Sequence, residues 1–152
     1  GAILLVVGTA TAFAWIATLS QVPIKLSTLL FSISDNPYML LFLINVLLLF
    51  VGMFLDAGPA ILILGPILAP TMVQLGVHPL HFAIIMCVNL TVGLATPPMG
   101  LILFVASGLT RLRVEVIALE MLPFLAIEIG VIFLITYVPA VSMTIPKLLG
   151  FY

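Results

Sequence analysis

Long apolar runs that carry almost no charge are the feature that most restricts how this chain can fold. The first, Ala2 to Leu19, contains no charged residue and is close to the roughly 20 residues that a helix needs to cross a bilayer. The whole chain is 64% hydrophobic and 6% charged, with a mean hydropathy of +1.48. Soluble domains carry about a quarter charged residues. The sequence therefore predicts an all-α integral membrane protein that lies in a lipid bilayer.

The charge and cysteine content exclude several classes of protein. A net charge of -1 leaves no basic face for nucleic acid, which we do not expect as a partner. Cys87 is the one cysteine, so neither a disulfide framework nor a cysteine metal cluster can form within the chain. Its apolar surroundings predict a small core residue.

The first 36 residues predict a membrane span followed by a helix of a different kind. Residues 1–20 form the span, expected to be part of a scaffold, and residues 21–36 are too polar to cross. In this second segment apolar residues recur at helical spacing from Val22 to Ile33, while Lys25, Thr28 and Ser32 line the opposite side. An amphipathic helix of this type is expected to lie along the membrane interface.

Residues 38–75 predict two short apolar helices joined by "DAG". Tyr38 to Leu55 is apolar apart from Asn45, and Pro59 to Leu75 contains three prolines. Each arm has 17 or 18 residues and spans about 25 Å, somewhat less than a bilayer core of about 30 Å. Both a pair of short spans and a re-entrant hairpin with its tip at residues 55–59 fit this pattern. The short arms and the prolines favour the hairpin.

Residues 79–110 predict one crossing built from two half-helices. Phe82 to Gly93 and Met99 to Thr110 are each 12 residues long, or about 18 Å of helix. The sequence "GLATPP", residues 93–98, separates them and would break a helix. We therefore expect a discontinuous transmembrane helix.

The remaining residues predict a last span at 114–138 and a C-terminal tail at 139–152. Arg111 and Arg113 precede the span and place their loop in the cytoplasm by the positive-inside rule. The mouth of the hairpin and the tail then lie on the opposite, periplasmic side. Lys25 and Lys147 oppose this orientation.

The break at 93–98 suggests a binding site, because non-helical backbone at membrane depth persists only where protein buries it or where it lines a polar cavity. Pro97 and Pro98 suit the first turn of the second half-helix, whose N–H groups favour an anion such as a carboxylate. The carbonyls of Gly93, Leu94 and Ala95 suit a hard cation. The Thr96 hydroxyl would add an oxygen ligand.

The expected hairpin tip repeats this chemistry. Leu55 ends one helix with free carbonyls, Asp56 adds a carboxylate, and Gly58 permits an unusual turn. Discontinuous helices that meet near the bilayer midplane indicate the substrate and ion site of a secondary transporter. A simpler interpretation is also open, in which Asp56 only caps a helix that begins at Pro59.

Three segments resemble the large, DctM-like membrane subunit of tripartite ATP-independent periplasmic (TRAP) transporters. They are "VGMFLDAGPAILILGPILAP" (Val51 to Pro70), "NLTVGLATPPMGLILFVASGL" (Asn89 to Leu109) and "LPFLAIEIGVIFLITYVPAVSMTIP" (Leu122 to Pro146). The resemblance runs along essentially all 152 residues and corresponds to the last third of that subunit. We therefore expect a C-terminal fragment of a longer permease.

The resemblance implies an elevator-type fold of two inverted repeats, of which this chain is the second. It implies sodium-driven import of organic acids, such as C4-dicarboxylates or sialic acids, across the bacterial inner membrane. A periplasmic binding protein would deliver the anionic substrate, and a small membrane subunit, separate or fused, would pack beside the permease. The interfacial helix would be the arm that links moving and fixed parts.

The resemblance places the substrate and ion site at the tip and the unwound segment, with Asn89 bracing the loop or reaching the site. The expected residues are Asp56, Ala57, Gly58, Asn89, Gly93, Leu94, Ala95, Thr96, Pro97 and Pro98. Among these, Na⁺ is expected at Asp56, Gly58, Gly93, Ala95 and Thr96; H⁺ stays an alternative coupling ion, and no organic cofactor is expected. Tips in this family often carry Gly and Ser after the Asp, so Ala57 and Gly58 leave the tip itself without a hydroxyl ligand, and backbone carbonyls would serve instead.

Other polar residues and other functions have weaker support. Glu128, at membrane depth, predicts a proton relay or a partner in another subunit. His78 and His81 open a helix at the water boundary without a third metal ligand type nearby.

The sequence also bears on other functions. Asp56 alone does not make an intramembrane aspartyl protease, and the motifs of serine or zinc hydrolases do not occur. A related ion-coupled carboxylate transporter, or a passive channel or scaffold subunit, stays open as an alternative.

Overall fold

The computed structural model describes residues 1–151, with the side chains at positions 2 and 3 left out. Within that part the regular structure is helical throughout. The helices are α1 (Ala2–Leu19), α2 (Val22–Ile33), α3 (Pro37–Phe54), α4 (Ala57–Gln74), α5 (Pro79–Ala95), α6 (Leu101–Thr110), α7 (Val114–Tyr137) and α8 (Pro139–Leu148). In a bilayer this is the expected outcome, because a helix pairs its backbone groups internally.

Helix lengths agree with an all-α membrane protein. Among the described residues, α3, α4 and α7 are long and apolar enough to cross a membrane. Residues of α1 and α2 together pass the same test, but the two helices are bent by 64° relative to each other. Helices α5 and α6 are shorter, at 17 and 10 residues.

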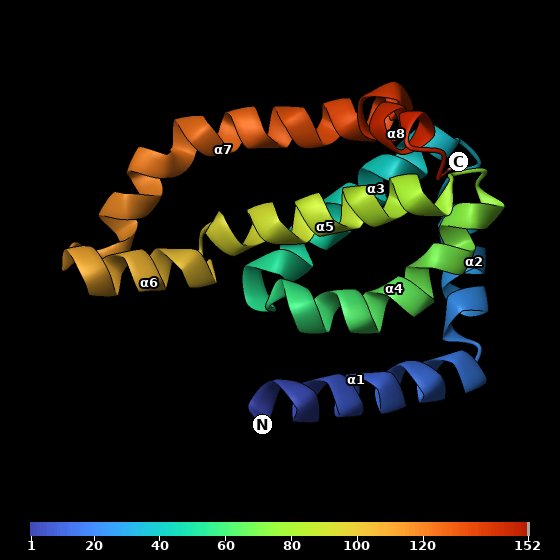
Figure 1. Cartoon of the computed structure of the whole chain (residues 1–152), viewed down its shortest axis with the longest axis horizontal. Coiled ribbons are helices and arrows are strands. Elements are labelled where there is room, and N and C mark those ends of the chain that lie inside the picture. Colours follow the sequence, from blue (N-terminus) through green and yellow to red (C-terminus); the bar gives the residue numbers. More distant parts are fainter. Residues whose placement is uncertain (152) are drawn as a thin grey trace.

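The longest axis of the molecule follows α5, α6 and α7. Helix α6 continues beyond the end of α5, and α7 runs back beside both (Figure 1). The turn between α3 and α4 lies near the break between α5 and α6, so the α3–α4 pair extends along α5 but not along α6 (Figure 1). Helix α3 packs mainly on α5, whereas α4 packs on α1, α5 and α2 and has little contact with α3.

The main buried cluster lies among the helices α2 to α5. Its residues are almost all aliphatic or aromatic, and those that are fully inaccessible include Leu40, Leu48, Leu68, Met72 and Leu90. A side-chain hydrogen bond of 2.7 Å from Ser27 Oγ to Gln74 Oε1 adds a polar link between α2 and α4. Both arms of the α3–α4 pair are therefore held by their neighbours.

Two glycines allow the backbones of α3 and α5 to touch. A Cβ added at Gly93 would lie 2.7 Å from the Gly52 Cα and 2.9 Å from the Leu49 carbonyl oxygen. A Cβ added at Gly52 would lie 2.8 Å from the Leu90 carbonyl oxygen. Membrane helices associate closely through such small residues, because lipid provides no hydrophobic drive for their association. Any other residue at either position would separate the two helices.

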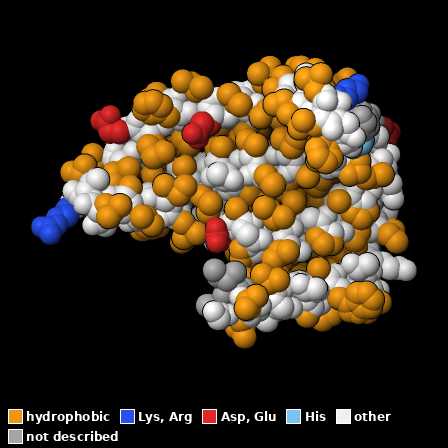
Figure 2. Space-filling view, viewed as in Figure 1, with side chains coloured by type: hydrophobic (Ala, Val, Ile, Leu, Met, Phe, Trp, Pro, Cys, Tyr) orange, Lys and Arg blue, Asp and Glu red, His pale blue; other side chains and the backbone are white. Residues whose placement is uncertain are grey.

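The surface is dominated by apolar side chains. Hydrophobic residues cover most of the visible face, and the few charged groups are scattered over it (Figure 2). Large side chains such as Phe104, Phe124 and Ile127 are more than half exposed in this chain. A surface of this kind suits lipid or a protein partner rather than water.

The structure adds a helix to the C-terminal tail and corrects the environment predicted for Cys87. The expected tail at 139–152 contains a helix, α8, which starts with Pro139 at its first turn, where a missing N–H costs nothing. Cys87 is exposed, not a core residue, because it lies on α5 opposite the face formed by Ile85, Met86 and Asn89. The prediction for Cys87 was wrong because an apolar sequence in a membrane does not distinguish a buried face from a lipid-facing one.

The glycine contact gives a stability prediction. Gly93→Ala in the full-length permease should lower the free energy of unfolding by about 1–3 kcal/mol, the usual cost of overpacking. Gly130→Ala in α7 is the matched control, because a Cβ there meets no atom within 4 Å and alanine raises helix propensity. Thermal unfolding in detergent measures both variants. Equal stability of Gly93→Ala and Gly130→Ala would show that α3 and α5 do not make this contact.

Candidate functional site

The break between α5 and α6 begins at Thr96 and ends at Gly100. The sequence predicts a break at 93–98, and the structure corrects this prediction, because Gly93, Leu94 and Ala95 are still helical. The Thr96 N–H donates to the Gly93 carbonyl over 3.0 Å, and the Thr96 hydroxyl donates to the Val92 carbonyl over 2.8 Å. These bonds extend α5 by satisfying carbonyls that would otherwise lack a donor at the helix end.

The Leu94 carbonyl, unlike that of Gly93, has no backbone N–H available within the helix. Its donors in a continuing helix would be the N–H groups of the residues three and four positions later, which here are Pro97 and Pro98. Proline has no N–H to donate. The two prolines therefore remove the helical partners of the Leu94 oxygen, and they precede α6 instead of forming its first turn.

Gly100 shapes the end of the break. Its φ of 33° lies in the left-handed region, which favours glycine. A Cβ at this position would lie 3.0 Å from both the Leu94 and the Thr96 carbonyl oxygens. The two oxygens therefore converge on one small region beside the N-terminus of α6, where carbonyl oxygens and first-turn N–H groups lie close together.

The turn between α3 and α4 is centred on Asp56. Its Oδ1 accepts a hydrogen bond of 2.8 Å from the Ala57 N–H, so Asp56 is the N-cap of α4, and the helix begins at Ala57 rather than at Pro59. Asp56 and Gly58 are exposed in this chain, and nothing lies within 4 Å of a Cβ built at Gly58. The tip therefore presents a carboxylate and a glycine without packing them against the rest of the chain.

The Gly52–Gly93 contact brings the turn and the break to the same level. Gly52 lies four residues before Asp56, and Gly93 lies three before Thr96. Among residues 1–151 no hydrogen bond joins the turn directly to the break. The two elements are thus neighbours because of the helices that carry them, and not because of a bond between their own side chains.

A buried polar network lies one to two turns from this contact. Asn89 Nδ2 donates to Asn45 Oδ1 over 2.7 Å and to the Ile85 carbonyl over 2.8 Å. Asn45 Nδ2 donates to Thr136 Oγ1 over 3.0 Å. The three side chains Asn45, Asn89 and Thr136 are at most 2% exposed and join α3, α5 and α7.

Asn89 turns toward Asn45 and not toward the α3–α4 turn. Two roles are expected for Asn89, bracing the loop or reaching the binding site. Its hydrogen bonds to Asn45 and Ile85 are of the kind that a bracing residue makes. Its Oδ1 has no hydrogen-bond partner within the described chain. Unpaired buried polar atoms are rare in folded proteins, so this oxygen, one turn before Gly93, also stays a candidate ligand.

His81 extends the polar contacts toward the end of the molecule. Its imidazole is only 4% exposed, with Nδ1 2.6 Å from Ser142 Oγ and Nε2 3.3 Å from the Thr136 carbonyl. His78, by contrast, caps α5, since its Nδ1 accepts a hydrogen bond from the Leu80 N–H. The two histidines expected at a water boundary thus occupy different environments, and His81 is a packing residue between α5, α7 and α8.

Sequence reasoning missed Asn45, Thr136 and Gly52 as residues that position the site. Asn45 carried a signal, because it is the one amide in its apolar run. Thr136 and Gly52 carried none, since both are common in membrane helices. Glu128 is half-buried in α7, one turn from the buried residues Leu125 and Ile132, and it makes no ion pair within the described residues.

Comparison with known proteins identifies residues 1–141 as matching the family "Tripartite ATP-independent periplasmic transporter, DctM component". The chain is 41% identical over 141 residues to the isethionate TRAP transporter permease protein DctMQ of Oleidesulfovibrio alaskensis, covering 93% of this chain and 22% of that protein. It is 37% identical over 148 residues to the C4-dicarboxylate TRAP transporter large permease protein DctM of Pseudomonas aeruginosa, covering 97% and 35%.

A third relative is the sialic acid TRAP transporter large permease protein SiaM of Vibrio cholerae. The identity is 37% over 138 residues, covering 91% of this chain and 32% of the relative. The chain thus spans about a third or less of the length of these relatives.

The polar network predicts energetic coupling between α3 and α5. In a double-mutant cycle of the full-length permease, Asn45→Ala and Asn89→Ala should be non-additive by about 0.6 kcal/mol and by no more than about 1.7 kcal/mol, as found for hydrogen bonds between membrane helices. Unfolding in mixed micelles measures the cycle.

A second cycle is the matched control. Asn45→Ala with Ser27→Ala should be additive, because the Ser27 hydrogen bond goes to Gln74 and shares no partner with Asn45. Additivity in both cycles would contradict the Asn45–Asn89 bond.

Proposed function

This chain belongs to the DctM family of TRAP transporter permease components, and we propose that it forms the C-terminal third of a permease that imports organic acids through the bacterial inner membrane. Transport is then an activity of the whole permease, of which this chain is a part. A periplasmic binding protein would deliver the substrate, and a small membrane subunit would pack beside the permease. The relatives' names support an anionic substrate, because isethionate, C4-dicarboxylates and sialic acid are all acids.

One observation carries the proposal: the α3–α4 turn lies beside the break between α5 and α6 instead of at the far end of the molecule (Figure 1). Helices α3 and α4 have 18 residues each and α7 has 24, or about 27 Å against about 36 Å. We infer that α7 crosses the bilayer and that α3 and α4 form a re-entrant hairpin whose tip stops at membrane depth. This chain would then be the second of two inverted repeats in an elevator-type transporter.

The tip and the break together supply ligands suited to Na⁺. A hard cation prefers carboxylate and carbonyl oxygens. The proposed donors are the Asp56 carboxylate, backbone oxygens at Gly58, Gly93 and Ala95, and the Thr96 hydroxyl, already hydrogen-bonded to Val92. Two other oxygens among the expected site residues would be available as ligands. They are the Leu94 carbonyl, which has lost its helical donors, and the unpaired Asn89 Oδ1.

The substrate carboxylate is proposed to bind at the start of α6. The N–H groups of Leu101 and Ile102, at the start of α6, have no preceding helical carbonyl to bond and carry the positive end of the helix dipole, whereas the Leu103 N–H already donates to the Gly100 carbonyl over 2.9 Å. Ala57, Pro97 and Pro98 would border the substrate. An occupied sodium site next to this position would increase the affinity for an anion through its positive charge, which is the physical basis of coupled uptake.

Sodium dependence tests the site. In proteoliposomes containing the complete permease and its partners, Asp56→Asn should weaken the apparent affinity for sodium by about 10- to 100-fold, the equivalent of one hydrogen bond to a charged group at about 1.5–3 kcal/mol. Uptake of a labelled organic acid, measured against sodium concentration, gives this affinity. Asp35→Asn is the matched control, because Asp35 lies in the exposed connection before α3.

Two outcomes would overturn the proposal. Uptake that does not depend on a sodium gradient and is unchanged by Asp56→Asn would favour a passive channel. A dependence on a proton gradient, lost in Glu128→Gln and kept in Asp56→Asn, would move the coupling site to α7.

A further inference from the structure

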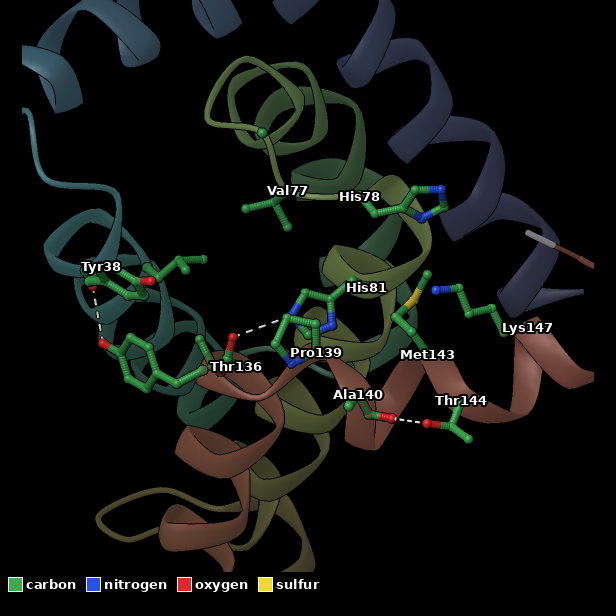
Figure 3. Close-up of a pocket in the computed structure, with 13 residues that line it drawn as sticks. Tyr38, Val77, His78, His81, Thr136, Pro139, Ala140, Met143, Thr144 and Lys147 are labelled. Carbon is green, nitrogen blue, oxygen red and sulfur yellow. Dashed lines mark hydrogen bonds between the residues drawn. The ribbon is translucent and has the colours of Figure 1, made fainter.

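A cavity opens at the end of the molecule where α3, α5 and α8 begin and α7 ends. Its volume is about 540 Å³. Figure 3 shows His78, His81 and Lys147 on its wall, together with Tyr38, Thr136 and Thr144. This cavity lies at the opposite end of α5 from the break, so it is separate from the proposed transport site.

The wall of the cavity concentrates the basic residues of the chain. The sequence has four Lys or Arg residues and two His, and three of these six side chains line this one cavity. None of the lining residues is Asp or Glu. The His81 Nδ1 contacts the Ser142 hydroxyl, and its Nε2 contacts the Thr136 carbonyl. Lys147 and His78 also take part in interactions within the chain. Lys147 gives this wall its formal positive charge, which favours an anion.

A second cavity adjoins the first and has a different character. It is about 680 Å³ in volume and is lined by Leu80, Ile145, Leu149 and Phe151, with prolines and His78. His78 lines both cavities. A cavity with a lysine on its wall and an almost entirely apolar groove therefore lie on either side of one shared residue, His78, close enough for a single amphiphile to reach both.

Aromatic residues mark this end of the molecule as a membrane–water boundary. The Tyr137 hydroxyl donates to the Tyr38 carbonyl over 3.0 Å, and the two rings are 6.0 Å apart. Tyrosine is enriched where the hydrocarbon meets the headgroups. On this placement the boundary passes near Tyr38 and Tyr137, which line the same cavity as Lys147, so a lipid headgroup at this level would be close to the lysine.

We propose that these two cavities bind one anionic phospholipid. Its phosphate lies near Lys147 and His78, and one acyl chain follows the groove formed by Leu80, Ile145, Leu149 and Phe151. A lysine close to the headgroups attracts an acidic phosphate by its charge, and the apolar groove adds the contact that a free anion cannot make. The lipid fastens α8 to the start of α5.

Lipid retention by the full-length permease tests this proposal. The protein is purified with its membrane subunit and incubated with micelles that contain phosphatidylglycerol or phosphatidylcholine, and bound lipid is counted by native mass spectrometry. Lys147→Gln should reduce phosphatidylglycerol retention about fivefold, the change that corresponds to about 1 kcal/mol for one lysine at an acidic surface. Lys147→Arg should retain the lipid, since the charge is kept.

Lys25→Gln is the matched control, because Lys25 is an exposed lysine on α2 and does not line either cavity. Leu80→Trp should reduce retention by filling the groove without changing the charge. Equal retention of the two lipids, or equal loss in Lys25→Gln and Lys147→Gln, would overturn the proposal. So would binding of glycerol phosphate as strong as that of the whole lipid, because it would indicate a site for free anions. Because these experiments measure lipid binding and not transport, a negative result would leave the proposed transport function unaffected.

Discussion

The contact between Gly52 and Gly93 is the interaction on which the arrangement of the candidate site depends. Helices α3 and α5 run in the same direction and touch backbone to backbone there, and this fixes how far the α3–α4 turn reaches along α5. Helices α3 and α4 have little contact with each other. One is held by α5 and the other by α1, α2 and α5, so the turn is positioned from two sides without packing of its own.

The buried amide side chains form a second set of contacts between the helices, and these contacts are favoured in a lipid environment. Hydrocarbon offers no hydrogen-bond partners, so each polar side chain inside the molecule must find one within the protein. Asn45, Asn89 and Thr136 find one another across three helices. Close packing at glycines sets the distance between two helices but still allows one helix to slide along the other. Hydrogen bonds between single side chains fix the register, because they form at only one position along the helices. The glycine contact therefore determines the separation of α3 and α5, and the hydrogen bonds determine their register.

Local sequence predicted the helices and the break well, because prolines, glycines and charged residues act on their own neighbourhood. The arm from Val22 to Ile33 and the ends of the long helices follow from such signals. The break was displaced by two to three residues, since the Thr96 hydroxyl and N–H continue the helix and Gly100 delays the next one. Contacts between distant segments, such as Gly52 with Gly93 or Asn45 with Thr136, are not encoded by any local pattern. The same holds for Cys87, whose face of α5 is set by neighbours and not by its own sequence.

The bond between Asn45 and Thr136 joins residues 91 positions apart in the sequence, and this has a consequence for the biosynthesis of the protein. A membrane protein is made from its N-terminus onward, so α3 emerges from the ribosome long before α7. The Asn45 amide can accept its hydrogen bond from Asn89 once α5 has been made, but its own N–H donor must wait for Thr136 until α4, α5, α6 and α7 have all been synthesised. The register of α3 against its neighbours is therefore completed in two steps, first with α5 and then with α7.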